Sequence, residues 1–262
     1  MKKTLFREER LRLIMEIISE QKSVIVNDLA EQFGKSPGSI RLDLAELESR
    51  GLISRTHGGA ILADDASEGL VLNKKVLQLR GETKTEEKQR IGKAVADLVH
   101  DGDSIMIDGG TTTYFVAKNL HTKRDLTIIT TSIHLFPVLW EIPDATIYLS
   151  GGVVHRGFED MYGEISLESI GKFKPDHTII GIDGVSVEYG ITATEPTMAM
   201  LKRSMVAVSK NLIVVADSSK FGKVCLLSVA DVQNVNSFVT DTDLTDEEVA
   251  ALSTLGPKVL RA

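Results

Sequence analysis

Five short apolar segments in the second half of the chain each end in small or polar residues that suit an anionic ligand. The candidate binding residues in these endings are Asp108, Gly109, Gly110, Thr111, Thr112, Thr113, Thr130, Thr131, Ser132, Gly151, Gly152, Asp183, Gly184 and Lys220. In the first ending, two glycines permit a close approach of the backbone, and the threonines open a helix with hydroxyls and free N–H groups. Such a helix start binds phosphate, and Lys220 would add a positive charge.

The segments before these endings are predicted to be strands of one parallel sheet. They are β-branched runs over 104–108, 126–130, 146–150, 178–182 and 212–216, and helices are predicted over 86–100, 112–120, 133–140, 165–173 and 196–209. This alternation is typical of a doubly wound α/β domain, in which ligands bind at the carboxyl ends of the strands. Each ending alone also fits an ordinary turn or helix cap. Their expected convergence on one edge favours a binding site.

The N-terminal residues predict a small helical unit with a β-hairpin. An amphipathic helix is expected over 7–21, a second over 28–33 with Asn27 as its cap and Gly34 as its end, and a third from Ser36 to Gly51. Strands are expected over 52–55 and 59–62. This is the pattern of a winged helix-turn-helix, in which the third helix enters the major groove of DNA. The alternative is a three-helix packing or dimerisation module.

Three residues on the third helix and two in the hairpin are the first candidates for DNA contacts. Ser36, Ser39 and Arg41 lie near the start of the helix, off its apolar stripe, and Arg55 and His57 can reach the DNA backbone. The first 62 residues carry a net charge of +1 and the remainder −8. The charge therefore permits DNA binding without arguing for it.

Composition places the chain among globular proteins. Of its 262 residues 42% are hydrophobic, the net charge is −7, and Cys225 is the single cysteine, which excludes a disulfide within one chain and argues for a reducing compartment. We expect no membrane span, signal peptide, cofactor or metal site, and a cytoplasmic location. The expected domains are a DNA-binding domain over 1–62, a linker over 63–75 and a sensing domain over 76–262.

The chain resembles the DeoR family of bacterial transcriptional regulators. The motifs that carry the resemblance include Ser39-Ile40-Arg41, His57-Gly58-Gly59-Ala60, Asp108-Gly109-Gly110-Thr111-Thr112 and Asp217-Ser218-Ser219-Lys220-Phe221. The resemblance implies a winged helix-turn-helix followed by a sensor domain similar to the fold of ribose-5-phosphate isomerase, with a pocket for a phosphorylated sugar.

Four positions depart from the family pattern. Lys35 replaces a hydrophobic residue, Ser39 a threonine, Leu42 a common second arginine and Thr131 a common asparagine. Leu42 lies off the core stripe and could contact a thymine methyl, and Lys35 restores some of the lost charge. Operator preference therefore does not transfer from relatives.

We expect a repressor of a carbohydrate operon that binds double-stranded operator DNA as a homo-oligomer under the control of a phosphorylated sugar. The alternative is a sugar-phosphate isomerase-like enzyme with an N-terminal interaction module, in which Asp108, Asp183 and Lys220 serve as acid, base and electrostatic clamp. A third possibility is a sensor domain that serves oligomerisation alone.

Overall fold

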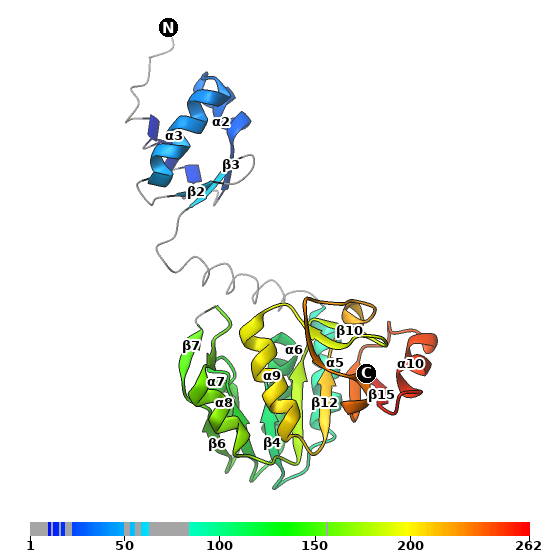
Figure 1. The fold of residues 1–262 in the computed structure, drawn as a ribbon. Helices are drawn as coiled ribbons and strands as arrows, with labels where there is room; N and C mark the ends of the chain where they lie inside the picture. The colour runs from blue at the N-terminus through cyan, green and yellow to red at the C-terminus, as the bar shows by residue number, and fades with distance from the viewer. Residues whose placement is uncertain are drawn as a thin grey trace. The chain divides into compact units, whose positions relative to one another are not determined.

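The structure is a computed structural model that describes residues 10–11, 13–15, 17–18, 23–49, 53–55, 59–62, 84–155 and 157–262. The chain divides into two compact units, Met1–Leu72 and Asn73–Ala262, and each is considered by itself (Figure 1). The linker predicted over 63–75, and His57, lie outside the described residues.

The N-terminal unit is a helix-turn-helix with a small antiparallel sheet. Residues 10–11, 13–15 and 17–18 are helical, within the range predicted for the first helix. The elements that follow are β1 (Ser23–Ile25), α2 (Val26–Phe33), α3 (Pro37–Ser49), β2 (Ile53–Arg55) and β3 (Gly59–Leu62). The strands pair in the order β1-β3-β2, which confirms the predicted hairpin and adds β1 to it.

The caps of the two central helices follow the sequence only in part. Asn27 was expected to cap the second helix, but α2 begins two residues earlier, with Ile25 at its N-cap and no side-chain cap bond. The helix starts here because β1 leads directly into it, without an intervening turn. Gly34 ends α2 in the left-handed conformation (φ 60°), as predicted. The turn into α3 is closed by Ser36, whose Oγ accepts the backbone N–H of Ser39 at 3.2 Å.

A buried ion pair joins the first helical segment to α3. The guanidinium of Arg10 binds the carboxylate of Asp43 through two nitrogens, at 2.6 and 3.0 Å. Both residues are buried, and the hydrogen bond to Asp43 is the main cause that raises the pKa of Arg10. The pair lies beside an apolar core that contains the predicted stripe Ile40, Leu44 and Leu47. It therefore fixes α3 against the helix that precedes it.

The larger unit is built on a seven-stranded parallel sheet. Its strands are β4 (Ser104–Ile107), β5 (Thr127–Thr130), β6 (Thr146–Leu149), β9 (His177–Gly181), β12 (Leu212–Val215), β14 (Ser237–Thr240) and β15 (Lys258–Arg261). They lie in the order β15-β14-β12-β9-β4-β5-β6, and every pairing is parallel. All five predicted strands are present, and β14 and β15 extend the sheet at one edge.

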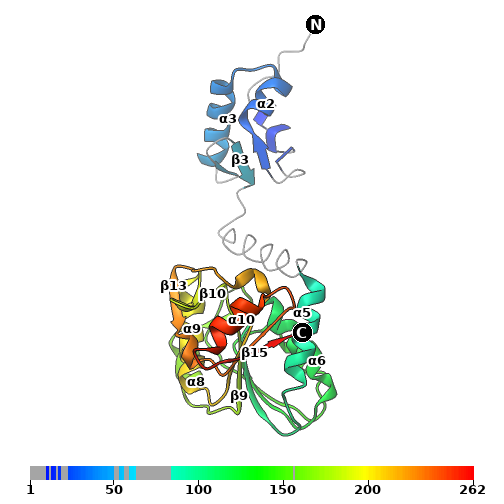
Figure 2. The same ribbon diagram turned by 90° about the vertical axis from the view of Figure 1, so that its right-hand side faces the viewer.

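Helices cover both faces of this sheet, as a doubly wound fold requires. They are α5 (Thr85–Ala96), α6 (Thr111–Asn119), α7 (Phe136–Leu139), α8 (Glu164–Gly171), α9 (Pro196–Val208) and α10 (Asp246–Ser253). Alternate strand residues point to opposite faces: Met106 packs with the helix α9 cluster, and Ile105 and Ile107 pack with the α5 and α6 cluster. Figure 2 shows α8 and α9 on one side of the sheet and α5 and α6 on the other.

Two smaller antiparallel sheets border the carboxyl edge of the large one. The first contains β10 (Gly184–Ser186), β11 (Gly190–Ala193) and β13 (Leu227–Ala230), and the second contains β7 (Val153–His155) and β8 (Asp160–Tyr162). Short 3-10 helices η1 (Leu120–Thr122), η2 (Ser218–Lys220) and η3 (Val232–Asn234) complete the unit.

Replacing Asp43 with Asn should lower the free energy of unfolding of the N-terminal unit by about 3–5 kcal/mol, because the buried Arg10 charge loses its counter-ion. Amide hydrogen exchange of α3 in the full chain measures this loss. The matched control is Asp28→Asn, which changes an exposed carboxylate on α2 and should shift stability by less than about 0.5 kcal/mol. Equal stability of the two variants would show that the ion pair does not hold α3.

Candidate functional site

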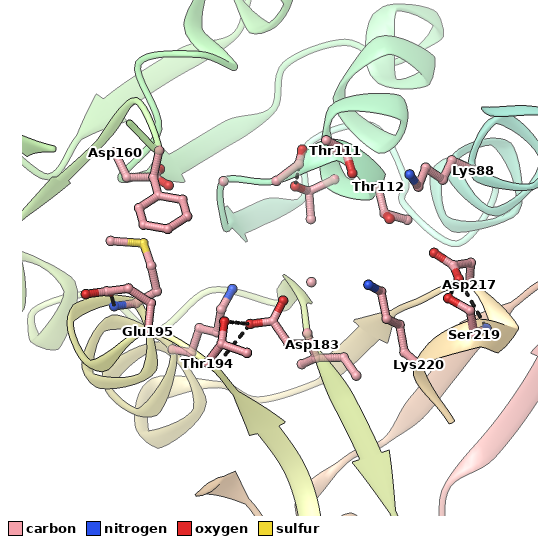
Figure 3. A pocket seen from close by; sticks show the side chains of 18 of the residues that line it. Lys88, Thr111, Thr112, Asp160, Asp183, Thr194, Glu195, Asp217, Ser219 and Lys220 are labelled. Atoms are coloured by element: carbon pink, nitrogen blue, oxygen red, sulfur yellow. Dashed lines mark hydrogen bonds between the residues drawn. The ribbon is translucent and has the colours of Figure 1, made fainter. Parts of the chain in front are cut away.

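A cavity of about 580 Å³ opens at the carboxyl ends of β4, β9 and β12. This volume lies within the range of small-molecule sites in proteins. The predicted residues that line it are Gly109, Gly110, Thr111, Thr112, Thr113, Asp183 and Lys220. Three of the five predicted endings therefore meet in one place, although they are far apart in the chain (Figure 3).

The start of α6 forms one wall of the cavity. The helix begins at Thr111, and within it the first intrahelical bond runs from the N–H of Tyr114 to the carbonyl of Gly110. The N–H groups of the first turn therefore have no partner inside the helix. Thr113 lines the same wall and donates its hydroxyl to the Gly110 carbonyl at 3.0 Å. This arrangement can bind an anion through the backbone and through the hydroxyls of Thr111 and Thr112.

Gly109 is required by a close approach of Asp160. A Cβ at position 109 would lie 2.3 Å from Oδ1 of Asp160, which leaves no room for a side chain. Asp160 comes from β8, so the turn after β4 and the β7–β8 hairpin fit together only with glycine here. The predicted close approach thus occurs between two parts of the protein itself.

Charged groups of opposite sign occupy different parts of the cavity. Figure 3 shows Lys88, Lys220 and Thr112 toward one end, where Asp217 is the labelled carboxylate, and Asp160 and Glu195 at the other end. Lys88 lies in the first turns of α5 and is buried, and Lys220 ends η2. The cavity therefore has a cationic end and an acidic end.

A cluster of three buried charges lies at the inner side of the cavity. Lys202 of α9 donates to Oδ2 of Asp108, which also accepts the N–H of Gly181 at 3.2 Å. Burial raises the pKa of Asp108, against the opposing charge of Lys202. Burial, followed by the charge of Asp108, raises the pKa of Asp160 to about 7. The protonation of Asp160 at the acidic end therefore depends on its buried neighbours Asp108 and Lys202.

The remaining predicted binding residues do not line the cavity. They are Asp108, Thr130, Thr131, Ser132, Gly151, Gly152 and Gly184. At the end of β5 the hairpin closes over the polar groups: Thr131 donates its hydroxyl to Asp160 at 3.3 Å and its carbonyl accepts the N–H of Met161. Thr130 is likewise turned inward, where its hydroxyl donates to the carbonyl of Ile107 at 2.7 Å.

The predicted glycines outside the cavity serve close packing between segments. A Cβ at Gly152 would lie 2.5 Å from the carbonyl oxygen of Tyr162, and one at Gly184 would lie 2.6 Å from that of Lys223. Gly151 adopts a positive φ of 73° in the turn after β6. Turn geometry, which was the alternative for each ending alone, accounts for these positions.

Several lining residues were not among the candidates. They are Lys84, Lys88, Phe158, Asp160, Gly181, Ile182, Thr194, Glu195, Met198, Lys202, Asp217 and Ser219. One local signal could have revealed two of them: Thr194 and Glu195 directly precede Pro196 at a helix start. Glu195 accepts the N–H of Met198 at 2.7 Å as the cap of α9, and Thr194 donates its N–H and hydroxyl to Asp183.

The candidate DNA contacts lie around the first turns of α3. Ser36, Arg41 and Leu42 are exposed, the last to 67%, while Lys35 and Ser39 are half-buried. Arg55 belongs to β2, and His57 lies outside the described residues. The exposed face of the helix is thus opposite the stripe that packs into the core.

Neither a membrane span nor a metal site is found in the part of the chain that the structure describes. No described helix is long and apolar enough to cross a bilayer. Within the same residues, no group of three or more His, Cys, Asp and Glu side chains could hold a metal ion.

Comparisons with known proteins agree with this architecture. Residues 10–66 match the DeoR-like helix-turn-helix domain, and residues 83–242 match the DeoR C terminal sensor domain. The chain is 34% identical to the HTH-type transcriptional repressor GlcR of Bacillus subtilis, over 90% of this chain and 89% of the relative. It is 32% identical to the glycerol-3-phosphate regulon repressor of Escherichia coli, over 87% of this chain and 88% of that protein.

A solved structure of D-ribose-5-phosphate isomerase in complex with phospho-erythronic acid is similar to part of the chain. It has 17% sequence identity and a TM-score of 0.40, and the match covers 52% of this chain and 54% of the isomerase. Both relatives are named as repressors, and residues 10–66 of this chain match a helix-turn-helix domain, so the isomerase alternative is not favoured and the protein is a regulator rather than an enzyme. From the two domain matches and these relatives we conclude that the chain belongs to the DeoR family of transcriptional regulators.

Proposed function

We propose that this protein is a repressor of a carbohydrate-metabolism operon, controlled by a phosphorylated sugar in the cavity at the sheet edge. The observation that carries the proposal is the cationic end of that cavity, where the start of α6 lies with Lys88 and Lys220. The names of two relatives support it, since one is the repressor of a glycerol-3-phosphate regulon and the other is the transcriptional repressor GlcR.

The phosphate of the effector binds at the cationic end. Backbone N–H groups at the start of α6, the hydroxyls of Thr111 and Thr112, and the Lys220 ammonium are all suitable donors to phosphate oxygens. Lys88 adds a second positive charge from α5. These groups recognise a phosphoryl group and carry no information about the rest of the molecule.

The hydroxylated part of the effector extends toward the acidic end. Asp183 and Glu195 present carboxylate oxygens that can accept hydrogen bonds from sugar hydroxyls, and Phe158 and Met198 offer apolar surface. The position of Asp160 and Lys202 at this end makes the contact sensitive to the charge of the ligand. The volume accommodates a molecule of the size of a sugar phosphate and excludes a polymer.

Operator DNA is bound by the exposed face of α3. Arg41 is placed to donate to a guanine edge or a phosphate, and Leu42 to contact a thymine methyl. Ser36 and Ser39 lie at the end of the helix that enters the major groove in this motif, and Lys35, Arg55 and His57 contact the DNA backbone. A repeated operator needs two DNA-binding units, so the protein acts as a homo-oligomer. It acts in the cytoplasm.

Replacing Lys220 with Gln should weaken the binding of sugar phosphates by about 10- to 100-fold, the loss of one charge-assisted hydrogen bond. Isothermal titration with a panel of pentose and hexose phosphates measures the affinities, and NMR of the same mixtures should show no conversion of the sugar. Lys223→Gln is the matched control, because Lys223 is exposed in the same loop and does not line the cavity. Undiminished affinity of the Lys220 variant would show that the phosphate binds elsewhere. Conversion of a sugar phosphate would support the isomerase alternative.

Replacing Arg41 with Ala should weaken operator binding by about 1–3 kcal/mol if Arg41 contacts a base edge. Fluorescence anisotropy with the operator and with random DNA of equal length separates base reading from phosphate contact. Arg124→Ala, an exposed change in the sensor unit, should leave both affinities unchanged. An equal loss on both DNAs would reduce Arg41 to a phosphate contact.

A further inference from the structure

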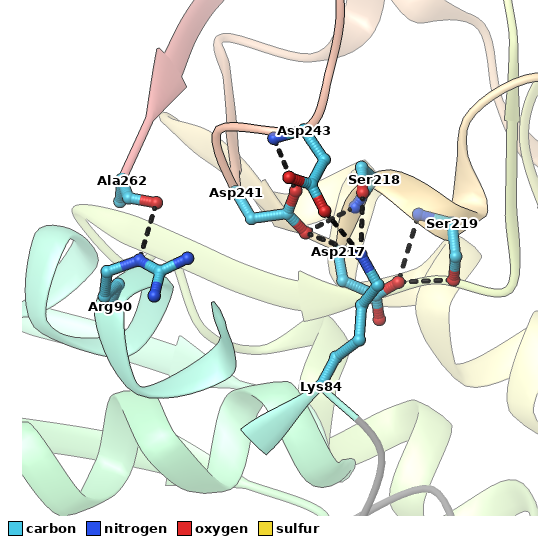
Figure 4. Close-up of polar contacts among 8 residues, drawn as sticks. All are labelled: Lys84, Arg90, Asp217, Ser218, Ser219, Asp241, Asp243 and Ala262. Carbon is cyan, nitrogen blue, oxygen red and sulfur yellow. Dashed lines mark hydrogen bonds and ion pairs between the residues drawn. The ribbon is translucent and has the colours of Figure 1, made fainter. Parts of the chain in front are cut away.

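Lys84 connects the cavity to the point where the chain enters the sensor unit. It is the first described residue of that unit and directly precedes α5, and residues 63–83 separate it from β3. Its side chain lines the cavity, but its ammonium contacts residues that are not among those proposed above to bind the effector. The Nζ atom lies 3.1 Å from Oγ of Ser218, 3.0 Å from Oδ2 of Asp243 and 3.8 Å from Oδ2 of Asp241 (Figure 4).

The partners of Lys84 belong to the loops that shape the cationic end of the cavity. Ser218 is the first residue of η2, which ends at Lys220. Asp241, which follows β14, is fully buried and accepts the N–H of Ser218 at 2.8 Å and the N–H of Asp243 at 3.0 Å. The ammonium of Lys84 therefore bridges the loop that carries Lys220 and the loop that carries Asp243.

The backbone of Lys84 has an unusual conformation at the start of α5. Its φ of 51° and ψ of 43° are in the left-handed region, which residues other than Gly, Asn and Asp seldom adopt. Among the described residues, the other non-glycine positions with positive φ are Asp125, Asp144 and Glu159. The α5 helix has no side-chain cap at this end, and the N–H of Lys88 donates to the Lys84 carbonyl. Release of the ammonium would thus allow the first turn of α5 to change.

We propose that Lys84 is the residue through which the effector acts on the chain leading to the DNA-binding unit. The anion of the effector and the carboxylates of Asp241 and Asp243 compete for its ammonium. When the anion binds the ammonium, the contacts with Asp241 and Asp243 are lost. The backbone of Lys84 at the start of α5 then changes conformation, which redirects the chain where it enters the sensor unit. The inference rests on the proposed function, since it requires an anion at the cationic end of the cavity.

The competition predicts different effects on phosphate and operator binding when Asp243 or Lys84 is replaced. Asp243→Asn should raise the affinity for inorganic phosphate by roughly 3- to 10-fold, because the ammonium is no longer held by that carboxylate. Without phosphate, the operator affinity of this variant should already be shifted toward the value that the wild type reaches with saturating phosphate. Lys84→Asn tolerates the left-handed backbone, and its operator affinity should no longer respond to phosphate.

The experiment uses the full-length protein, with titration calorimetry for phosphate and anisotropy for the operator, at an ionic strength held constant with chloride. The matched control is Asp97→Asn, which removes the exposed partner of Lys93 at the other end of α5 and should change neither constant. The Asp243 side chain is 65% exposed, so its replacement should leave the melting temperature close to that of the wild type.

Two results would overturn the inference while the proposed function stands. In the first, Lys220→Gln weakens phosphate binding, but Asp243→Asn changes neither phosphate binding nor operator affinity relative to the wild type. In the second, the Lys84→Asn variant binds phosphate more weakly, but its operator affinity still changes as the phosphate site fills. Lys84 would then be a ligand contact only. Failure of the wild type to bind inorganic phosphate and every sugar phosphate would remove both proposals together.

Discussion

The common direction of the seven strands is the constraint on which the site depends. Because all pairings are parallel, every strand ends at the same edge, and every crossover helix starts near it. The strands β12, β9 and β4 are neighbours in the middle of the sheet, so their endings around Asp217, Asp183 and Gly109 come together from distant parts of the chain. The cationic end of the cavity follows from this topology, because the start of α6 and the loop of Lys220 must both lie there.

The buried charges next to that edge are better explained by binding than by stability. A buried ion pair such as that of Lys202 and Asp108 gains little net stability, since the desolvation of both ions offsets their attraction. The second carboxylate, Asp160, increases the cost, because burial and then the charge of Asp108 disfavour its ionised form and raise its pKa. The cluster ties α9 and the β7–β8 hairpin to the turn at Gly109, which keeps the start of α6 in place. An arrangement that costs stability and holds the start of α6, where we propose that the anion binds, fits a ligand-responsive protein.

The sequence predicted the central strands and the three endings that meet, because β-branched runs and glycine-rich turns are local signals. It did not predict β14 and β15, which extend the sheet beyond β12. It also assigned Thr130, Thr131 and Ser132 to the cavity, because no local pattern shows that β8 covers the end of β5. Lys84 and Lys88 were missed for the corresponding reason: Lys84 directly precedes α5 and Lys88 lies on it, and only the fold shows that this end of the helix reaches the sheet edge.

Control of DNA binding requires a ligand to bind two arrangements of the protein with different affinity, and the difference need not be large. Typical coupling free energies are about 1–3 kcal/mol. An exposed ion pair contributes about 0–1 kcal/mol, and a hydrogen bond to a charged group about 1.5–3 kcal/mol. The partly exposed Lys84 makes the first kind of contact with Asp243 and the second kind with Ser218. The exchange of one ammonium between carboxylates and an anion is therefore of the required size. Because Lys84 directly precedes α5, such an exchange would act on the incoming chain without a relay through the sheet.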